Sequence, residues 1–452
     1  MTTPMNSRKM MTLKTTSFRA LTAVAFLTVA GACSTNDILK VDRPDVIDPG
    51  KLAGANGAAA LYNGAVGEVA YSQGGTFAGF MLMSGLFSDE FRFGGTPPEV
   101  REFDLDQIKA ENSFAQSIWL NLHRGRRAAE RAADAIAAAV APTDKRVGEL
   151  RALAGLSTIW IAETYCSGAP MSVDQPAVVY GSNLTTDQML DSALTRLNAA
   201  SSATGSDQNV VNLIAVLRGR ALLDKGQFAA AAVAVTGVPI SFRYELNFSA
   251  SDARTQNAMK AYIYDYDYMS VSDHEGVSGL NYASAADPRV DVTQAFGPVS
   301  RFDAVTPMFQ FTEYSSYSSP ITDASGIEAR LIEAEGALQA ASLGASPVWL
   351  AKLNEARATL PGLTPLADPG TPAARVDLMF RERAFWMFST GHRLGDMRRL
   401  VRQYGRSGAS VYPRGDYHKD SLTRGDQVSV RVSIDELNNP NYDKSKCDPT
   451  KA

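Results

Sequence analysis

Alanine-rich helical sequence fills the chain between residues 51 and 236 and constrains its fold more than any other feature. Alanine has the highest helix propensity, and its small side chain lets neighbouring helices approach closely. Apolar residues recur at helical spacing in residues 150–165, residues 112–140 form one long helix or a pair, and residues 185–201 begin with a threonine suited to capping a helix. The sequence therefore predicts a mainly α protein built from packed helices.

Two segments have the pattern of paired helices. Residues 210–235 read as an apolar helix, a Lys-Gly turn and an alanine-rich second helix that starts at Phe228. Residues 326–340, followed by residues 347–360, repeat this arrangement. Both look like tetratricopeptide units, although the regular period of about 34 residues is absent. We expect an interrupted array of helix pairs.

Composition changes between residues 238 and 322, where alanine thins out and aromatic residues, serine, aspartate and glycine take over. Residues 260–273 have tyrosine at every second position, which predicts a strand with four tyrosines on one face: Tyr262, Tyr264, Tyr266 and Tyr268. Beyond residue 50 we therefore expect a helical part, an irregular part that carries short strands, and a second helical part, with the bounds 51–237, 238–322 and 323–452.

A basic segment opens the chain and leads into an apolar stretch at residues 20–32. This stretch is too short for a permanent transmembrane helix, but it fits the core of a signal peptide. The small residues that precede Cys33 resemble a bacterial lipobox, in which the cysteine thiol receives a diacylglycerol. We predict a signal peptide at 1–32, lipidation of Cys33 and a polar tether at 33–50. The alternative is an ordinary signal peptide followed by a chance cysteine.

If Cys33 carries lipid, Cys166 and Cys447 remain as an even pair in an oxidising compartment. They form either one disulfide or two buried thiols. The cysteine spacings typical of metal sites and redox motifs are absent from the sequence.

Sequence motifs of catalysis are missing. The chain has four histidines, without a G-x-S-x-G, H-E-x-x-H or P-loop motif. Its net charge of −4 argues against a nucleic-acid partner, and four of its basic residues lie in the first 32. We expect no enzymatic activity, no cofactor, no metal and no nucleic-acid partner.

A charged cluster follows a strongly apolar helix near residue 390. Because apolar residues cover most of the circumference of that helix, it is predicted to be buried. Gly391 ends it, and we expect His392 and Arg393 to lie close to Asp396 across the turn. Arg393 and Arg398 can each bind a carboxylate through two hydrogen bonds. The cluster is either a structural ion-pair network or a ligand site.

The same cluster carries a family resemblance. The run from Arg381 to Leu400 resembles the signature of the SusD/RagB family of outer-membrane nutrient-uptake lipoproteins, with matches at Gly391, His392, Arg393, Asp396, Arg398 and Arg399. Thr390 and Met397 depart from the usual Glu and Leu. Further stretches resemble family motifs in the family's order: ADPRV (286–290), ARLIEAEGAL (329–338), LNEAR (353–357) and VRVSIDELNNPNY (430–442).

This resemblance implies a tetratricopeptide-like scaffold with a loop-rich part, anchored by lipid on the outer face of the outer membrane. It also implies a protein that performs no chemistry, captures a nutrient, by default a glycan, and passes it to a SusC-like TonB-dependent barrel. The glycine, histidine and arginine signature then belongs to the scaffold.

Tyrosines are the candidate ligand residues, because a flat sugar face stacks well on an aromatic ring. The candidates are the four tyrosines of residues 262–268 and their polar neighbour Asp265: Tyr262, Tyr264, Tyr266 and Tyr268. The alternative is a half-buried strand whose tyrosines pack on the scaffold.

Phe87, Phe91 and Phe93, in or next to the loop-rich segment 88–104, are candidates for the barrel interface. Two other classes of function stay open. One is a tetratricopeptide-type scaffold lipoprotein that binds envelope proteins only, and the other is a lipid-anchored hydrolase.

Overall fold

The computed structural model describes residues 55–174, 177–294 and 297–452. The chain divides into two units, Met1–Leu52 and Ala53–Ala452, and the described residues all belong to the second. The predicted signal peptide, Cys33 and the tether at 33–50 lie outside the described residues.

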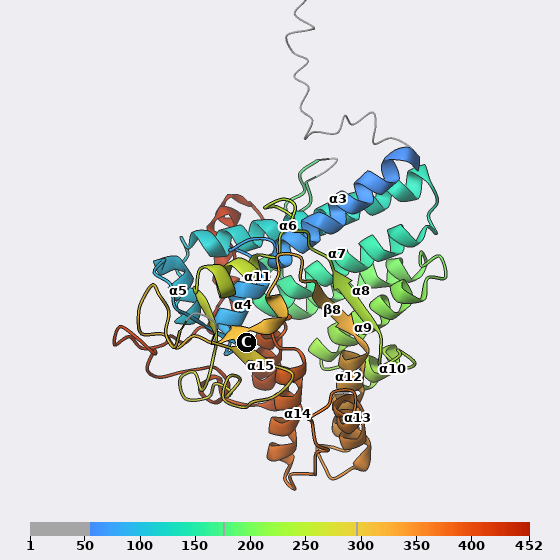
Figure 1. The fold of residues 1–452 in the computed structure, drawn as a ribbon. Coiled ribbons are helices and arrows are strands. Elements are labelled where there is room, and N and C mark those ends of the chain that lie inside the picture. Colours follow the sequence, from blue (N-terminus) through green and yellow to red (C-terminus); the bar gives the residue numbers. More distant parts are fainter. Residues whose placement is uncertain (1–54, 175–176, 295–296) are drawn as a thin grey trace, which may run out of the picture. The chain divides into compact units, whose positions relative to one another are not determined.

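Antiparallel helices packed side by side form the scaffold of this unit (Figure 1). Packing follows chain order for α3 (Ala55–Gly74), α6 (Ser113–Ala139), α7 (Lys145–Thr164), α8 (Thr186–Ser201), α9 (Gln208–Asp224) and α10 (Phe228–Ala234). The array continues with α12 (Gly326–Ala340) and α13 (Pro347–Arg357). The predicted helices are confirmed, and residues 112–140 contain a single long helix.

Local sequence explains where these helices begin. Thr185 and Gln188 form a capping box at the start of α8, in which the Gln188 backbone N–H donates to Thr185 Oγ1 over 3.2 Å and the Thr185 N–H donates to Gln188 Oε1 over 2.9 Å. Asn112, Asp144 and Asp207 accept backbone N–H groups at the starts of α6, α7 and α9.

Both predicted helix pairs are present. A left-handed glycine, Gly226 at φ +70°, makes the turn between α9 and α10. α10 then packs against α12, where a Cβ on Gly336 would approach the Phe228 carbonyl oxygen to 3.0 Å. The glycine thus permits close contact between the first pair and the second.

Short strands and loops make up the irregular part, and the described residues form four two-stranded antiparallel sheets. The pairs are β1 (Phe91–Phe93) with β5 (Met269–Val271), β2 (Ala169–Pro170) with β3 (Asn183–Leu184), β4 (Arg243–Leu246) with β8 (Ile321–Ser325), and β6 (Val292–Thr293) with β7 (Gln310–Phe311). Strands thus lie on both sides of the boundary predicted at residue 238.

The predicted tyrosine strand is wrong. Residues 258–260 form α11 (Ala258–Lys260), which continues as the π-helix η2 (Ala261–Asp265), and the strand β5 begins only at Met269. Asn257 caps α11 through the Met259 N–H, and the Tyr266 N–H donates to the Ala261 carbonyl over 2.8 Å, a five-residue turn. Capping starts a helix that the alternating tyrosines alone did not reveal.

The predicted barrel-facing loop is also wrong, because Phe87, Phe91 and Phe93 are fully buried. The segment is ordered by α4 (Phe80–Phe87), β1 and α5 (Pro98–Asp104). Its three phenylalanines belong to the hydrophobic core that runs through the unit.

The C-terminal region contributes residues to this core. It contains α14 (Pro372–Trp386), α15 (Arg393–Tyr404), α16 (Gly408–Val411) and the 3-10 turns η4 (Ile434–Asn438) and η5 (Lys444–Lys446). The buried residues of α14 confirm the predicted buried helix. Among the described helices, none combines the length and the apolar character that crossing a membrane requires.

Candidate ligand-binding groove

The signature cluster at α15 forms buried internal ion pairs. Arg393 binds Asp89, which follows α4, through Nε–Oδ1 at 2.6 Å and Nη2–Oδ2 at 2.9 Å. Asp396 instead accepts from Arg383 and Arg399, each over 2.8 Å. The predicted two-bond carboxylate contact of Arg393 is confirmed, but its partner lies far away in the sequence.

Arg398 departs from the prediction, because carbonyl oxygens rather than a carboxylate bind it. Its Nη1 donates to the carbonyls of Ala162, Glu163 and Tyr165 over 2.8–2.9 Å. These carbonyls are at the C-terminal end of α7, where helical carbonyls lack partners within the helix. Arg398 on α15 therefore donates the hydrogen bonds that the carbonyls at the C-terminal end of α7 lack.

His392 and Glu163 form a buried pair, with Nδ1 and Oε2 2.8 Å apart. Burial raises the pKa of Glu163 to about 8, against the opposing effect of the Arg220 charge. Burial likewise lowers the pKa of His392 to about 3. Near pH 7 both groups are therefore largely neutral, and the pair is a hydrogen bond rather than an ion pair. Contacts of this kind favour the structural interpretation of the signature.

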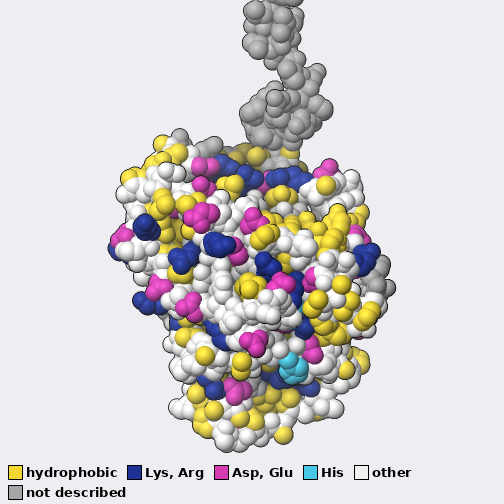
Figure 2. Space-filling model, turned by 90° about the vertical axis from the view of Figure 1, so that its left-hand side faces the viewer, with side chains coloured by type: hydrophobic (Ala, Val, Ile, Leu, Met, Phe, Trp, Pro, Cys, Tyr) yellow, Lys and Arg dark blue, Asp and Glu magenta, His cyan; other side chains and the backbone are white. Residues whose placement is uncertain are grey.

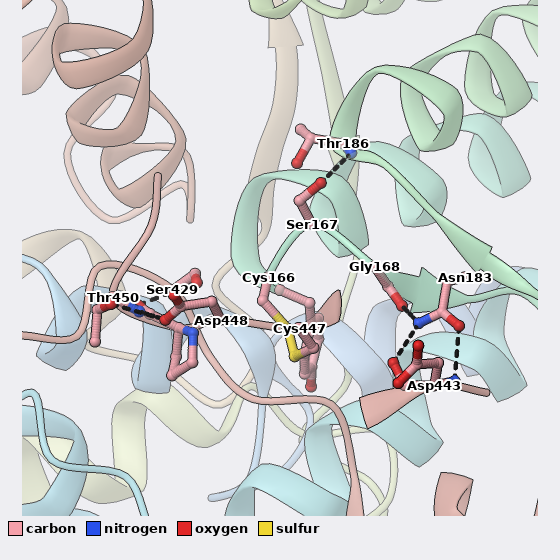
Figure 3. The surroundings of a disulfide bond; sticks show 12 residues. Cys166, Ser167, Gly168, Asn183, Thr186, Ser429, Asp443, Cys447, Asp448 and Thr450 are labelled. Carbon is pink, nitrogen blue, oxygen red and sulfur yellow. Dashed lines mark hydrogen bonds between the residues drawn. A yellow bond between two sulfur atoms is a disulfide. The ribbon is translucent and has the colours of Figure 1, made fainter. Parts of the chain in front are cut away.

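A disulfide joins Cys166, just beyond α7, to Cys447 in the C-terminal tail, with a Cα–Cα distance of 5.2 Å. Of the two alternatives in the sequence, the structure contains the disulfide. Figure 3 shows a second connection beside it: Asn183 Nδ2 donates to the Asp443 carbonyl over 3.0 Å, and the Asp443 N–H donates back to Asn183 Oδ1 over 2.8 Å. The tail is thus fixed to the loop that follows α7.

An aromatic groove of about 400 Å³ lies where three separate segments meet. The end of α3 and the residues after it, the π-helix η2 and the loop before β8 provide its rings: Tyr71, Phe77, Tyr262, Tyr266 and Tyr317. We call this the aromatic groove. Three of these rings lie in the predicted irregular part 238–322, and Tyr71 and Phe77 lie in the predicted helical part 51–237.

The four predicted tyrosines divide between the groove and its surroundings. Tyr262 stacks on Phe77 at a centroid distance of 3.9 Å, and Tyr266, 47% exposed, lies 5.6 Å from Tyr262. Residues four apart lie on one side of a helical turn, so these two share the groove. Tyr264 points elsewhere and donates its hydroxyl to the Phe311 carbonyl over 2.8 Å. Tyr268 packs against Phe302 at 4.5 Å, outside the groove lining.

Asp265, the fifth candidate, supports the groove rather than lining it. It accepts the Tyr317 hydroxyl over 2.6 Å and also binds Lys260. Burial would raise its pKa, but these two hydrogen bonds hold the pKa below its usual value. Asn257 holds the other side of the same loop, donating from Nδ2 to the Ser319 carbonyl over 2.8 Å. The Tyr317 ring is thus held in place before any ligand arrives.

Positive charge around the groove is paired. Arg254 lies over the Tyr71 ring at 4.4 Å and binds Glu68, and Lys260 binds Asp265. Burial raises the pKa of Tyr262 to about 12, so its hydroxyl stays protonated at neutral pH. The groove therefore offers aromatic rings and neutral hydroxyls rather than a net charge.

Sequence reasoning missed Tyr71, Phe77, Tyr317 and Arg254. They come from the end of a helix and from three loops, all outside the stretch of alternating tyrosines. Only the folding of these segments against η2 assembles them.

A larger hollow of about 530 Å³ lies between the β4–β8 pair and the end of α14. Two of its aromatic rings, Phe385 and Trp386, already lie against the Arg289 guanidinium, at 5.1 and 5.2 Å. Arg289 is itself held by Asp287 and Glu382. Phe385 in this hollow is only 1% exposed, whereas Tyr266 in the aromatic groove is 47% exposed, so we favour the smaller aromatic groove as the ligand site. Among the described residues, no cluster of histidine, cysteine, aspartate and glutamate is suited to hold a metal ion.

Solved structures share this fold along most of the chain. A SusD superfamily protein from Bacteroides thetaiotaomicron VPI-5482 has a TM-score of 0.64 at 14% identity, covering 86% of this chain and 99% of that one. A SusD-like carbohydrate binding protein from Bacteroides vulgatus ATCC 8482 has a TM-score of 0.62 at 14% identity, covering 87% and 98%. A laminarin binding SusD-like protein has a TM-score of 0.56 at 15% identity, covering 86% and 100%.

The sequence matches no family model and no curated protein. The architecture is nevertheless specific: a tetratricopeptide-like helical scaffold that carries an irregular part with short strands. This is the SusD fold, and the resemblance seen in the sequence is confirmed at the level of the fold.

Proposed function

We propose that this chain is a non-catalytic surface lipoprotein that binds a neutral glycan in the aromatic groove and passes it to a SusC-like TonB-dependent barrel. Lipid on Cys33 would hold it at the outer face of the outer membrane. The SusD fold supports this class of function, and the carbohydrate-binding description of one structural neighbour supports the ligand class.

The aromatic groove is the observation that carries the proposal. Tyr266 is nearly half exposed, and Tyr317 is held by Asp265, so ring faces are available without rearrangement. Preorganised rings lower the entropy lost on binding. The paired cations next to the groove, Arg254 and Lys260, favour a neutral sugar over an acidic one.

Calorimetric titration of residues 34–452 against neutral and acidic oligosaccharides tests the proposal, with laminarin oligosaccharides in the panel because a structural neighbour is described as binding laminarin. We expect a neutral glycan to bind and Tyr266→Ala to weaken it by about tenfold or more, the equivalent of ~1.4 kcal/mol. The control is Tyr180→Ala, since Tyr180 is also 47% exposed but lies in another part of the unit.

Glycan binding that both variants retain would move the site away from the groove. Binding only to acidic glycans, with strong dependence on salt, would contradict the argument from paired charges. No binding across the panel, together with co-purification of envelope proteins, would favour the alternative of a scaffold lipoprotein.

A further inference from the structure

An exposed apolar tip lies in the loop between β2 and β3. Val178 and Val179 are each 60% exposed, and Tyr180 is 47% exposed. We call these three residues the apolar tip. Contiguous apolar side chains at a protein surface are candidates for contact with a partner or a membrane.

The base of the apolar tip is braced against the scaffold. Val173 and Val179 exchange backbone hydrogen bonds of 3.0 and 2.9 Å, and Arg126 on α6 donates to the Ser172 carbonyl over 2.7 Å. Asp174 pairs with Arg127 and with Arg131 on the same helix, at 2.9 and 2.8 Å.

The C-terminal tail braces the opposite side. Asn441 Nδ2 donates to the Tyr180 carbonyl over 2.8 Å, and Asn439 Nδ2 donates to the Gly181 carbonyl over 2.9 Å. The Cys166–Cys447 disulfide and the Asn183–Asp443 contacts in Figure 3 fix this tail in turn. The protein therefore presents the apolar side chains on a fixed support.

The apolar tip lies towards the end of the unit at which α3 begins. α3 and α6 run antiparallel, with Gly125 against Val69, so the start of α3 lies towards the end of α6. The loop between β2 and β3 is bonded to the second half of α6, and the ribbon view places this loop and the first turn of α3 on the same side (Figure 1). The described part of the chain begins there, at Ala55. On the face that Figure 2 shows, basic and acidic side chains are interspersed.

We propose that the apolar tip inserts into the surface of the lipid bilayer to which Cys33 is anchored. The presence of a lipid anchor is part of the proposed function, whereas the apolar tip is a feature of the structure. Three side chains offer far less area than the roughly 800 Å² that each partner contributes to a stable protein interface. A contact with lipid needs no such area, because the anchor already holds the protein beside the bilayer. Tyrosine next to valine also suits the boundary between headgroups and acyl chains.

Charge around the tip does not oppose this contact. Asp174, the acid nearest to the tip in the sequence, pairs with Arg127 and Arg131. Insertion of the tip therefore brings this carboxylate towards the lipid as part of an ion pair.

Lipid-attached protein tests the proposal directly. Residues 33–452 are coupled through the Cys33 thiol to a maleimide lipid in phosphatidylcholine vesicles, a step for which the Cys166–Cys447 disulfide leaves Cys33 as the reactive thiol. Tyr180→Trp places an indole at the tip, and acyl chains brominated near the headgroup quench an indole that inserts. The matched control is Val233→Trp, because Val233 on α10 is 74% exposed and far from the loop (Figure 1).

We expect quenching of the indole at position 180 to exceed that of the control several-fold, and Val178→Ser with Val179→Ser to reduce it to the control level. Equal quenching at both positions would overturn the proposal. Quenching at position 180 that falls as more protein is coupled to each vesicle, or when a barrel is added, would overturn the proposal in favour of a protein partner.

Chemical coupling supplies the anchor, so the outcome does not depend on lipidation of Cys33 in the cell. Glycan titration of the same variants reports on the aromatic groove separately.

Discussion

At the scale of single residues, Gly391 shows how closely the signature residues pack against the core. It has φ +84°, and an added Cβ would meet the ring of buried Phe80. Gly391→Ala combines backbone strain with overpacking, so we expect the free energy of unfolding to fall by roughly 2–5 kcal/mol. Gly405→Ala is the matched control, because Gly405 has φ +65° but open space around it. Its loss is expected to be only about 1–2 kcal/mol, from strain alone. Denaturant unfolding measures both, and equal losses would refute a specific contact with Phe80.

Glu163 determines part of the pH dependence. Its folded pKa, raised by burial to about 8, lies above its ordinary value of 4.5. The folded state therefore binds the proton more tightly, and this contribution to stability is complete below about pH 4.5 and is lost as pH rises through 8. Glu163→Gln keeps a neutral group that can donate to His392. We expect this variant to lose less stability than wild type between pH 5 and 9, by on the order of a few kcal/mol. Parallel pH profiles of thermal unfolding would contradict this role.

The C-terminal tail shows, at the scale of elements, how a segment without regular structure is held. The Cys166–Cys447 disulfide links this tail to the end of α7. The two cysteines are 281 residues apart in the sequence. Cys447→Ser should lower the free energy of unfolding by about 2–5 kcal/mol, because the unfolded chain gains conformational freedom. Reductant should destabilise wild type by a similar amount and leave the variant unchanged. A variant that remains sensitive to reductant would contradict the assignment.

At the scale of the whole molecule, α15 connects segments that are far apart in the sequence. α15 supplies Arg393 to Asp89, Arg398 to the end of α7 and Arg399 to Glu335 on α12. Residues 53–390 would lack these partners and leave buried carboxylates unpaired, a large penalty. We expect this fragment to lose near-ultraviolet circular dichroism and cooperative melting, whereas residues 53–452 melt cooperatively. A cooperative transition in the fragment would show that the helical scaffold folds without α15.

Local sequence determined the helices, their caps and their pairing, since propensity, periodicity and capping act within a few residues. The helix in residues 112–140 and the Thr185 cap are examples. The two cysteines allowed a disulfide but did not require it. The sequence likewise indicated a buried α14, and its signature indicated the SusD fold. It did not reveal which residues bind the arginines of that signature.

Tertiary structure alone decided which residues meet. Asp89 reaches Arg393 across 304 residues, and Tyr317 joins Tyr266 at the aromatic groove through a loop that Asn257 fixes. Even the tyrosine pattern was ambiguous, because spacing two fits a strand while spacing four fits the turn that η2 makes. The pattern within one segment does not reveal a site that several segments assemble, since the geometry of such a site arises from long-range packing.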